Sequence, residues 1–352
     1  MPTPRDPATP HGRMAIDNPR RRDALAAEVM LGAVHGLPAD ARVLVIDDLD
    51  GLVEAGLRER HARVYRWCRL TVGDRPGLPW PGAGPFDAAC LRLPKIKAAF
   101  EMALHAAASV LAPGAPLWVY GANDEGIKSA ARVITPIFGS AAAIDARRHC
   151  RVIEAHRPRE ASVRTRLAEW RGFVSPPVAG HAQWVTYPGV FAKGVLDAGT
   201  AVLLAALPAF SGQRVLDFGC GGGPIAADIL RRAPDAEVHL LEADALSLLA
   251  AHENLPGAPT HLSDAWHGLP PGIRFDRVVS NPPIHRGKGE DFEALRALVL
   301  GAPAVLRPGG ELWMVVQRQV PVGPLLESCL DRVEIARQDS RFRVWRAHAP
   351  AR

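Results

Sequence analysis

What this 352-residue sequence lacks already excludes several classes of protein. It has only 5 cysteines and no Cys-x-x-Cys pair, so neither a disulfide framework nor a zinc site is predicted. No apolar run approaches the roughly 20 residues of a membrane span, and the first residues lack the apolar stretch of a signal peptide. We therefore expect a cytoplasmic protein that carries no metal.

Length and composition favour two globular domains. At about 150 residues per domain, the chain is long enough for two hydrophobic cores. Hydrophobic residues make up 48% of the sequence and charged residues 22%, as in ordinary globular proteins. Residues 1–22 are rich in proline and arginine, and we expect them to form a disordered basic tail.

Positive charge is concentrated in the first half of the chain. The net charge is +5, but residues 1–176 carry an excess of +6 and the remainder carries −1. Arginines cluster in residues 58–75 and again in residues 147–171. Such a surface can bind RNA phosphates through salt-sensitive contacts, or it can be an ordinary solvated surface, and charge alone leaves both interpretations open.

The two halves of the chain repeat one pattern. Short apolar runs that end in Asp, Gly or Pro alternate with longer stretches at helical spacing, which is typical of alternating strands and helices. We therefore predict two tandem α/β units, joined within residues 157–177. The matching runs are residues 42–47, 86–91 and 111–119 in the first half and 214–219, 275–280 and 306–314 in the second, at offsets of 172, 189 and 195 residues.

A glycine-rich turn stands between a strand and a helix in the second half. After the apolar run 214–218 comes Gly-Cys-Gly-Gly-Gly at residues 219–223, and Pro224 suits the first position of a helix over 225–232. Glycines let the backbone approach a ligand at a helix N-terminus. The third glycine is misplaced for the dinucleotide motif Gly-x-Gly-x-x-Gly, so a hydride-transferring dehydrogenase is disfavoured.

Two acidic residues follow the next strands. Glu242 ends the expected strand 238–241, where related folds bind a ribose diol, and Asp264 can accept a hydrogen bond from an adenine amino group. The turn and the acids together predict a nucleoside-containing cofactor. The predicted cofactor-binding residues are Asp217, Gly219, Cys220, Gly221, Gly223, Glu242 and Asp264.

The most informative motif is Asn281-Pro282-Pro283-Ile284, which directly follows the strand 275–279. The prolines fix the backbone and hold the Asn281 amide at the carboxyl end of the strand. Its side-chain carbonyl and the backbone carbonyl of Pro282 can each accept a hydrogen bond from a planar exocyclic amine and orient it toward an electrophile. Asn-Pro-Pro also occurs in ordinary turns, but its place after the glycine turn and the acids favours a catalytic role for these four residues.

Residues 185–348 resemble the class I methyltransferases that use S-adenosylmethionine, with residues 217–221 as the cofactor loop and residues 281–284 as the amino-methylating motif. More narrowly, the chain resembles the 16S ribosomal RNA guanine-N2 methyltransferases, the small-subunit rRNA methyltransferase C family. Supporting segments are residues 121–130, 187–191 and 196–200. The resemblance implies two tandem Rossmann-like domains, S-adenosylmethionine as cofactor, and ribosomal RNA or the small ribosomal subunit as partner of a monomeric enzyme.

One position departs from the usual motif. Many amino-methylating enzymes have Phe or Tyr where this chain has Ile284, and that ring stacks on the target base. Because Ile284 cannot stack in this way, we expect Phe191 to supply part of the apolar surface. His285 and Lys288 follow the motif and are candidates either for contact with RNA phosphate or for ordinary solvated charge.

The first copy has lost the chemistry. Residues 47–51 read Asp-Asp-Leu-Asp-Gly, so three carboxylates replace the glycine turn, and residues 92–95 read Arg-Leu-Pro-Lys in place of Asn-Pro-Pro-Ile. We therefore divide the chain into the tail 1–22, a degenerate methyltransferase-like domain 23–165 that binds or supports RNA, and a catalytic domain 166–352.

The predicted reaction is methyl transfer from S-adenosylmethionine to the exocyclic N2 of a guanine in 16S ribosomal RNA. The first alternative is methylation of another planar amine, namely a 23S rRNA guanine, adenine N6 or a protein glutamine. The second is a non-catalytic protein that binds the cofactor and acts in ribosome assembly.

Overall fold

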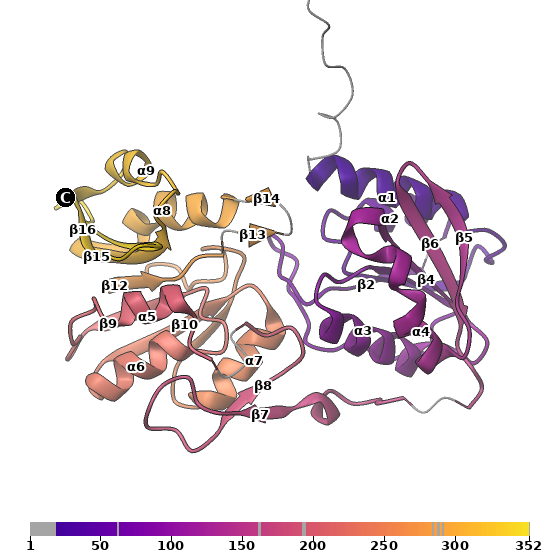
Figure 1. Ribbon diagram of the computed structural model, residues 1–352, viewed down its shortest axis with the longest axis horizontal. Coiled ribbons are helices and arrows are strands. Elements are labelled where there is room, and N and C mark those ends of the chain that lie inside the picture. Colours follow the sequence, from indigo (N-terminus) through magenta and orange to yellow (C-terminus); the bar gives the residue numbers. More distant parts are fainter. Residues whose placement is uncertain are drawn as a thin grey trace, which may run out of the picture.

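The computed structural model describes residues 19–61, 63–160, 163–191, 195–283, 285–286, 289–290 and 292–351. Figure 1 shows two α/β domains side by side, each a central sheet with helices on both faces. The prediction of two tandem Rossmann-like domains is confirmed. Within the described residues, no helix is long and apolar enough to cross a membrane.

The first sheet has six strands, which run parallel except for the fifth in spatial order, which is antiparallel to both of its neighbours. Side chains of one strand alternate between the faces, so Val43 and Val45 pack under α1 and α2 while Leu44 and Ile46 pack against α3 and α4. The spatial order is β2 (Arg63–Trp67), β1 (Arg42–Ile46), β3 (Ala88–Arg92), β4 (Pro116–Ala122), β6 (Cys150–His156) and β5 (Ala142–Arg147), with helices α1 (Pro19–Ala33), α2 (Leu52–Arg58), α3 (Lys97–Val110) and α4 (Ala131–Phe138) and the short helices η1 (Asn123–Glu125) and η2 (Ile127–Ser129).

The second sheet repeats this order and adds one strand at its edge. The order is β11 (Thr260–Leu262), β10 (Glu237–Glu242), β9 (Arg214–Phe218), β12 (Phe275–Ser280), β15 (Leu306–Gln317), β17 (Phe342–His348) and β16 (Asp331–Gln338), with helices α5 (Ala198–Leu204), α6 (Pro224–Arg232), α7 (Ala245–Asn254), α8 (Glu293–Val305) and α9 (Gly323–Glu327). Two further pairs are β7 (Gly172–Val174) with β8 (Trp184–Thr186) and β13 (His285–Arg286) with β14 (Gly289–Glu290).

Strand registers confirm the sequence repeat. Leu44 pairs with Ala89, and Ala89 pairs with Leu117. At the predicted offsets, Leu216 pairs with Val278, and Val278 pairs with Leu312. Residues of the two domains can therefore be compared one by one, and Arg92 occupies the position of Asn281.

The expected basic tail is too long by four residues. Helix α1 begins at Pro19, because proline suits the first turn of a helix, and Arg22 is already buried. Residues 19–22 therefore belong to the first domain, and residues 1–18 lie outside the described part of the chain.

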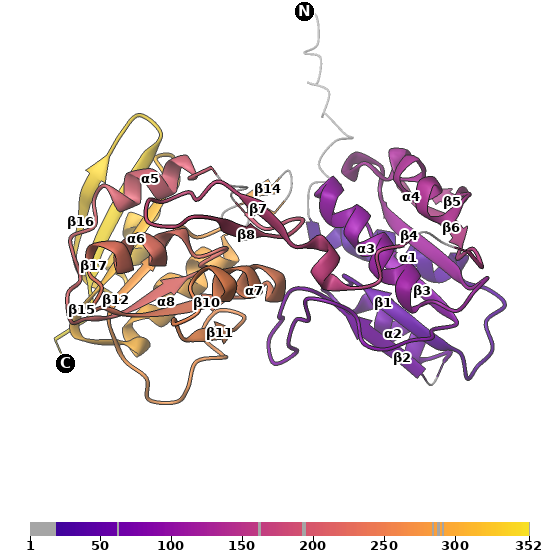
Figure 2. The same ribbon diagram turned by 90° about the horizontal axis from the view of Figure 1, so that it is seen from below.

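The expected boundary at residues 165 and 166 falls in the segment that joins the domains, shortly before the helix η3 (Leu167–Trp170). Trp170 packs in one cluster with Met102 of the first domain and with Val185 and Leu246 of the second. Figure 2 shows this segment running between the domains. The exact boundary stays a prediction, because the joining segment contacts both sides.

Candidate active site

The predicted cofactor-binding residues and Asn281 lie at or just after the carboxyl ends of four adjacent parallel strands, β11, β10, β9 and β12. This edge is where open α/β sheets bind their ligands. Ser280, at the end of β12, is fully buried, and its hydroxyl donates to the Phe218 carbonyl at 2.8 Å. That bond ties the start of Asn-Pro-Pro to the start of the glycine turn.

The glycine turn lies between β9 and α6, as predicted. Gly219, Gly221 and Gly223 all have positive φ angles, of 71°, 56° and 91°, a conformation that side chains disfavour. A Cβ on Gly219 would lie 3.9 Å from Pro283, and one on Gly221 would lie 4.0 Å from Phe191. The turn is thus an open cradle bounded by the Asn-Pro-Pro motif and by Phe191.

Asp217 lies beneath this turn and is completely buried. One carboxylate oxygen accepts from the Ala226 N–H at 3.1 Å, while the other has no hydrogen-bond partner in the described part of the structure. Burial raises the pKa of Asp217 to about 7, and the nearby charge of Glu242 adds to this. A cationic ligand would relieve this buried charge.

Glu242 ends β10 and fixes the backbone around it. Its carboxylate accepts from Gly221 N–H at 2.9 Å, Ala243 N–H at 2.8 Å and Asp244 N–H at 3.1 Å. Burial raises the pKa of Glu242, as does the charge of Asp244, although these N–H donors oppose the rise. A carboxylate has about four acceptor positions, so this one can still accept from a ligand hydroxyl.

Asp264 follows β11 and is half-buried. Its Oδ2 accepts a hydrogen bond at 2.8 Å from the backbone N–H of Gly73, which belongs to the first domain. The sequence did not indicate that an element so distant along the chain would hold this carboxylate.

Asn281 is held by helix α5. Its side-chain nitrogen donates to Asp197 Oδ2 and to Thr200 Oγ1, both at 2.9 Å. Asp197 also accepts from the Thr200 N–H at 3.0 Å and so caps the helix. Because both bonds use the amide nitrogen, the side-chain carbonyl turns away from α5.

Three residues carry roles that sequence reasoning missed. Asp197 and Thr200 were noted only within a segment of family resemblance, although Asp-x-x-Thr at a helix start is a recognisable cap. Asn254 of α7 bonds to Gly222 O at 3.1 Å and to both backbone groups of Val185, and so links the glycine turn to β8. No local signal identifies Asn254.

The other predicted site residues lie in the core, at the rim of the cradle, or outside the described residues. Cys220 packs in the core, and its N–H donates to Leu241 O at 3.0 Å, so its side chain does not enter the cradle. Phe191 is 61% exposed at the rim, while Pro282 is buried. Ile284, Lys288 and the side chain of His285 lie outside the described residues. Among the described residues, no cluster of His, Cys, Asp and Glu could hold a metal ion.

The first domain keeps part of the backbone conformation of the site but not its functional side chains. Asp47 and Gly51 have positive φ, as do Gly219 and Gly223. Arg92, at the position of Asn281, pairs instead with Asp23 and Glu125 at 2.5 and 2.7 Å. This ion-pair cluster fills the place where the second domain presents an amide carbonyl.

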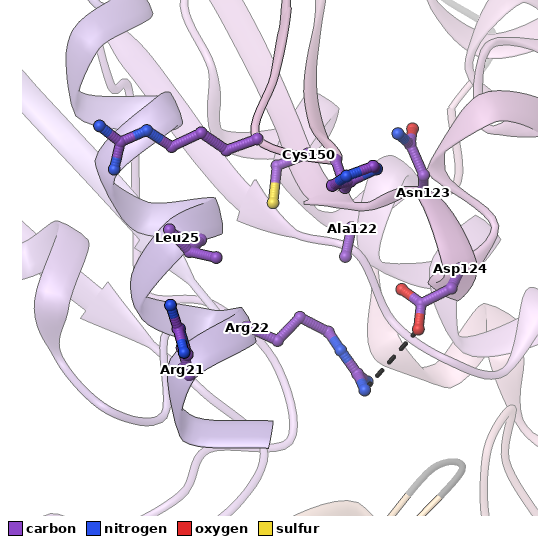
Figure 3. A pocket seen from close by; sticks show the side chains of 9 residues that line it. Arg21, Arg22, Leu25, Ala122, Asn123, Asp124 and Cys150 are labelled. Atoms are coloured by element: carbon purple, nitrogen blue, oxygen red, sulfur yellow. Dashed lines mark ion pairs between the residues drawn. The ribbon is translucent and has the colours of Figure 1, made fainter. Parts of the chain in front are cut away.

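Near this cluster the first domain contains a pocket of about 180 Å³ (Figure 3). It lies between the start of α1 and the carboxyl end of β4. Arg22 extends into it toward Asp124 at 3.7 Å, and its Nε has no hydrogen-bond partner in the described part of the chain. The lining residues are Arg21, Arg22, Leu25, Ala122, Asn123, Asp124, Arg148, His149 and Cys150.

Two family models match the chain, the N-terminal methyltransferase small domain over residues 56–171 and the methyltransferase small domain over residues 181–346. Ribosomal RNA small subunit methyltransferase C of Hahella chejuensis is 31% identical over 93% of this chain and 96% of its own. The Pseudomonas fluorescens protein of that name is 34% identical over 86% and 92%.

A solved structure is also similar over nearly the whole chain. The 16S rRNA guanine-N2 methyltransferase of T. thermophilus, in complex with S-adenosylmethionine and guanosine, superimposes with a TM-score of 0.79. It is 25% identical, with coverage of 92% of this chain and 91% of that one.

The buried charge of Asp217 makes a prediction about stability. The pKa of Asp217 is raised from 3.8 to about 7, so the native state holds the carboxyl proton more tightly than the unfolded state does. The contribution of Asp217 to the free energy of unfolding therefore falls as the pH rises from 4 to 7. Asp217→Asn should therefore raise the free energy of unfolding at pH 8 by about 4 kcal/mol and leave it nearly unchanged at pH 4. Urea unfolding at both pH values measures this, with the exposed Asp235→Asn as control. A less stable Asp217→Asn protein at pH 8 would contradict it.

Proposed function

Because the chain belongs to the ribosomal RNA small subunit methyltransferase C family, we propose that it transfers a methyl group from S-adenosylmethionine to the exocyclic N2 of a guanine in 16S ribosomal RNA. The observation that carries the proposal is the Asn281 amide, fixed with its carbonyl turned away from α5 at the edge of the glycine cradle.

The second domain would hold the cofactor with its buried acids and its glycine turn. S-adenosylmethionine supplies an electrophilic methyl group on a sulfonium when it is bound. Asp217 offers an unpartnered carboxylate oxygen, which suits a cationic group, and Glu242 offers an acceptor for a ribose hydroxyl. Gly219 and Gly221 leave room where side chains would block the cradle.

The Asn-Pro-Pro motif would orient the guanine amine. The carbonyls of Asn281 and Pro282 would accept hydrogen bonds from the two N–H groups of the guanine amine. This would direct the lone pair of the amine nitrogen toward the methyl group. The new nitrogen–carbon bond would form as the carbon–sulfur bond breaks, so S-adenosylhomocysteine would leave and the excess proton on the methylated nitrogen would pass to solvent. Asn281 and Pro282 would act by holding the amine in place, not as bases. A paired guanine must be extruded from its helix to reach these carbonyls, at a cost of a few kcal/mol.

The first domain would bind RNA rather than cofactor. Three arginines, Arg21, Arg22 and Arg148, line its pocket beside the start of α1, whose first turn has no acidic residue. Guanidinium groups at a helix N-terminus favour phosphate. We propose that an RNA backbone phosphate binds there.

The remaining expectations follow from this chemistry. We propose that the enzyme works in the cytoplasm, where ribosomal RNA is the partner, and that it needs no metal, because the sulfonium itself activates the methyl group. We also propose that it acts as a monomer, as the resemblance described above implies.

The proposed substrate is tested directly by offering the protein several different methyl acceptors. Purified protein is incubated with labelled S-adenosylmethionine and, separately, with small subunits, large subunits, naked 16S RNA and a release factor. We expect label in 16S RNA as N2-methylguanine. Label only in 23S RNA, in adenine or in protein would support an alternative amine, and no label with intact cofactor binding would support a non-catalytic assembly protein.

Asn281→Ala tests the amine contact. The variant loses one acceptor for the amine but none of the groups assigned to the cofactor, so the transfer rate should fall at least about 100-fold while the Kd for the cofactor stays within about twofold. Isothermal titration and single-turnover methylation measure the two quantities. Turnover like that of the wild type would refute the role of Asn281.

Asp197→Ser tests how Asn281 is oriented. Serine keeps the helix cap but is too short to reach the Asn281 nitrogen as well, so one amide donor loses its partner. The transfer rate should fall about tenfold, since an unsatisfied buried donor costs about 1–3 kcal/mol. The cofactor Kd, which should stay close to wild type, serves as the control. An unchanged rate would show that α5 does not orient the amide.

The double variant Arg21→Ala/Arg148→Ala tests the RNA contact. The KM for RNA should rise several-fold at constant kcat, and the slope of log KM against log salt should decrease by about 0.7–0.9 per lost phosphate contact. The double variant Arg332→Ala/Arg337→Ala, on the exposed face of β16, is the matched control. Equal effects of the two double variants would indicate general charge attraction and no site at the pocket.

A further inference from the structure

A short segment of the first domain, residues 69–73, is built into the second domain. We name it the bridging segment. It follows β2 and pairs in antiparallel fashion with the turn after Glu242, through Thr71 N–H to Ala243 O at 2.8 Å and Ala245 N–H to Arg69 O at 3.0 Å. In Figures 1 and 2 the chain after β2 lies between the two domains.

The two paired turns are equivalent in the internal repeat. Ile46 pairs with Trp67 in the first sheet as Phe218 pairs with Leu241 in the second, which places Leu70 at the position of Asp244. The bridge between the domains joins these two residues. Its two hydrogen bonds are therefore related by a pseudo-twofold axis, like an isologous dimer contact within one chain.

Arg69 breaks this symmetry in favour of the second domain. Its guanidinium binds both carboxylate oxygens of Asp244, at 3.2 and 2.5 Å, and donates to Pro188 O at 2.9 Å. Asp244 caps α7 and lies two residues after Glu242. Pro188 precedes the segment that places Val190 and Phe191 near the glycine turn. One side chain thus holds two walls of the cradle, and only 15% of it is exposed.

The end of the bridging segment reaches the third wall. Gly73 N–H donates to Asp264 Oδ2 at 2.8 Å. Gly73 has a φ of 59° and open space around its Cβ position, so glycine is favoured there by the backbone conformation. All the elements carrying Glu242, Phe191 and Asp264 are therefore contacted by five consecutive residues of the first domain.

We propose that the bridging segment is a positioning element of the cofactor site, in which Arg69 sets the affinity for S-adenosylmethionine without touching it. This rests on the proposed function for the location of the cofactor. It assigns to the degenerate domain a role apart from RNA binding, because the Arg69 guanidinium is occupied by the second domain. Bidentate Arg to carboxylate pairing gives this kind of geometric control.

A second ion pair provides a matched control. Arg171, in the joining segment, pairs with Glu253 at 2.5 Å, and Glu253 lies at the far end of α7 from Asp244. Both ion pairs tie α7 to chain outside the second sheet, and Glu253 also accepts from the Tyr187 hydroxyl at 2.6 Å, but only Arg69 joins the start of α7 beside Glu242 to the Pro188 carbonyl. General loosening of the structure would follow from losing either pair, whereas loss of positioning follows from Arg69 alone.

The experiment measures S-adenosylhomocysteine Kd by isothermal titration for full-length wild type, Arg69→Ala, Arg69→Lys and Arg171→Ala. Arg69→Ala should weaken binding about tenfold, within the usual range of coupling between sites. Arg69→Lys should recover part of the loss, because lysine keeps the charge but not the paired donors. Arg171→Ala should stay within about twofold, and kcat at saturating cofactor should stay within about threefold for all of them.

Three outcomes would overturn the proposal. Wild-type affinity in Arg69→Ala would show that Arg69 does not set the site, and equal losses in Arg69→Ala and Arg171→Ala, in proportion to lowered unfolding temperature, would show a purely structural role. In both cases the wild-type protein still binds the ligand, so the proposed function stands. A wild-type protein that fails to bind would instead overturn the proposed function together with this inference.

Discussion

The whole site depends on the orientation of one side-chain amide. Asn281 can accept from an amine only if its own nitrogen is engaged elsewhere, and Asp197 and Thr200 of α5 provide those acceptors. The prolines after it fix the backbone, and Ser280 anchors it to β9. A rotation of this amide by half a turn would replace an acceptor by a donor, which would repel the target amine.

The two domains show how one backbone supports two roles. The position of Asn281 is held by Arg92 in the first domain, and the position of Glu242 is held by a buried cysteine, Cys68. Asp47 keeps the positive φ of Gly219, since Asp tolerates that conformation better than most residues. The side chains of the first domain have closed its site, whose turn also lacks the positive φ of Gly221 at Leu49 and whose sheet, in the part of the chain that the structure describes, has no counterpart of β11. The retained turn after β2 now contacts the second site.

The sequence predicted the strands, their order of repetition and the site edge because these depend on local apolar patterns and on short motifs. The offsets between the halves agree with the register of Leu44 and Leu216 with their neighbours. It did not predict the contacts of Asp197 with Asn281 or of Gly73 with Asp264, which join residues 84 and 191 positions apart. Such pairs depend on how helices and domains pack, and no local pattern encodes them. The predicted N-terminal tail was four residues too long, because the arginines at residues 20–22 gave no sign that a helix begins at Pro19.

In this account, fixed carbonyl acceptors in the second domain orient a guanine amine of the small ribosomal subunit for methyl transfer from S-adenosylmethionine. Mass spectrometric mapping of ribosomal RNA from cells with and without this protein tests it most directly. The predicted result is that one N2-methylguanine of 16S RNA is absent without the protein and returns when the wild-type chain is expressed. A 16S RNA with unchanged N2-methylguanine in both cells would contradict the claim.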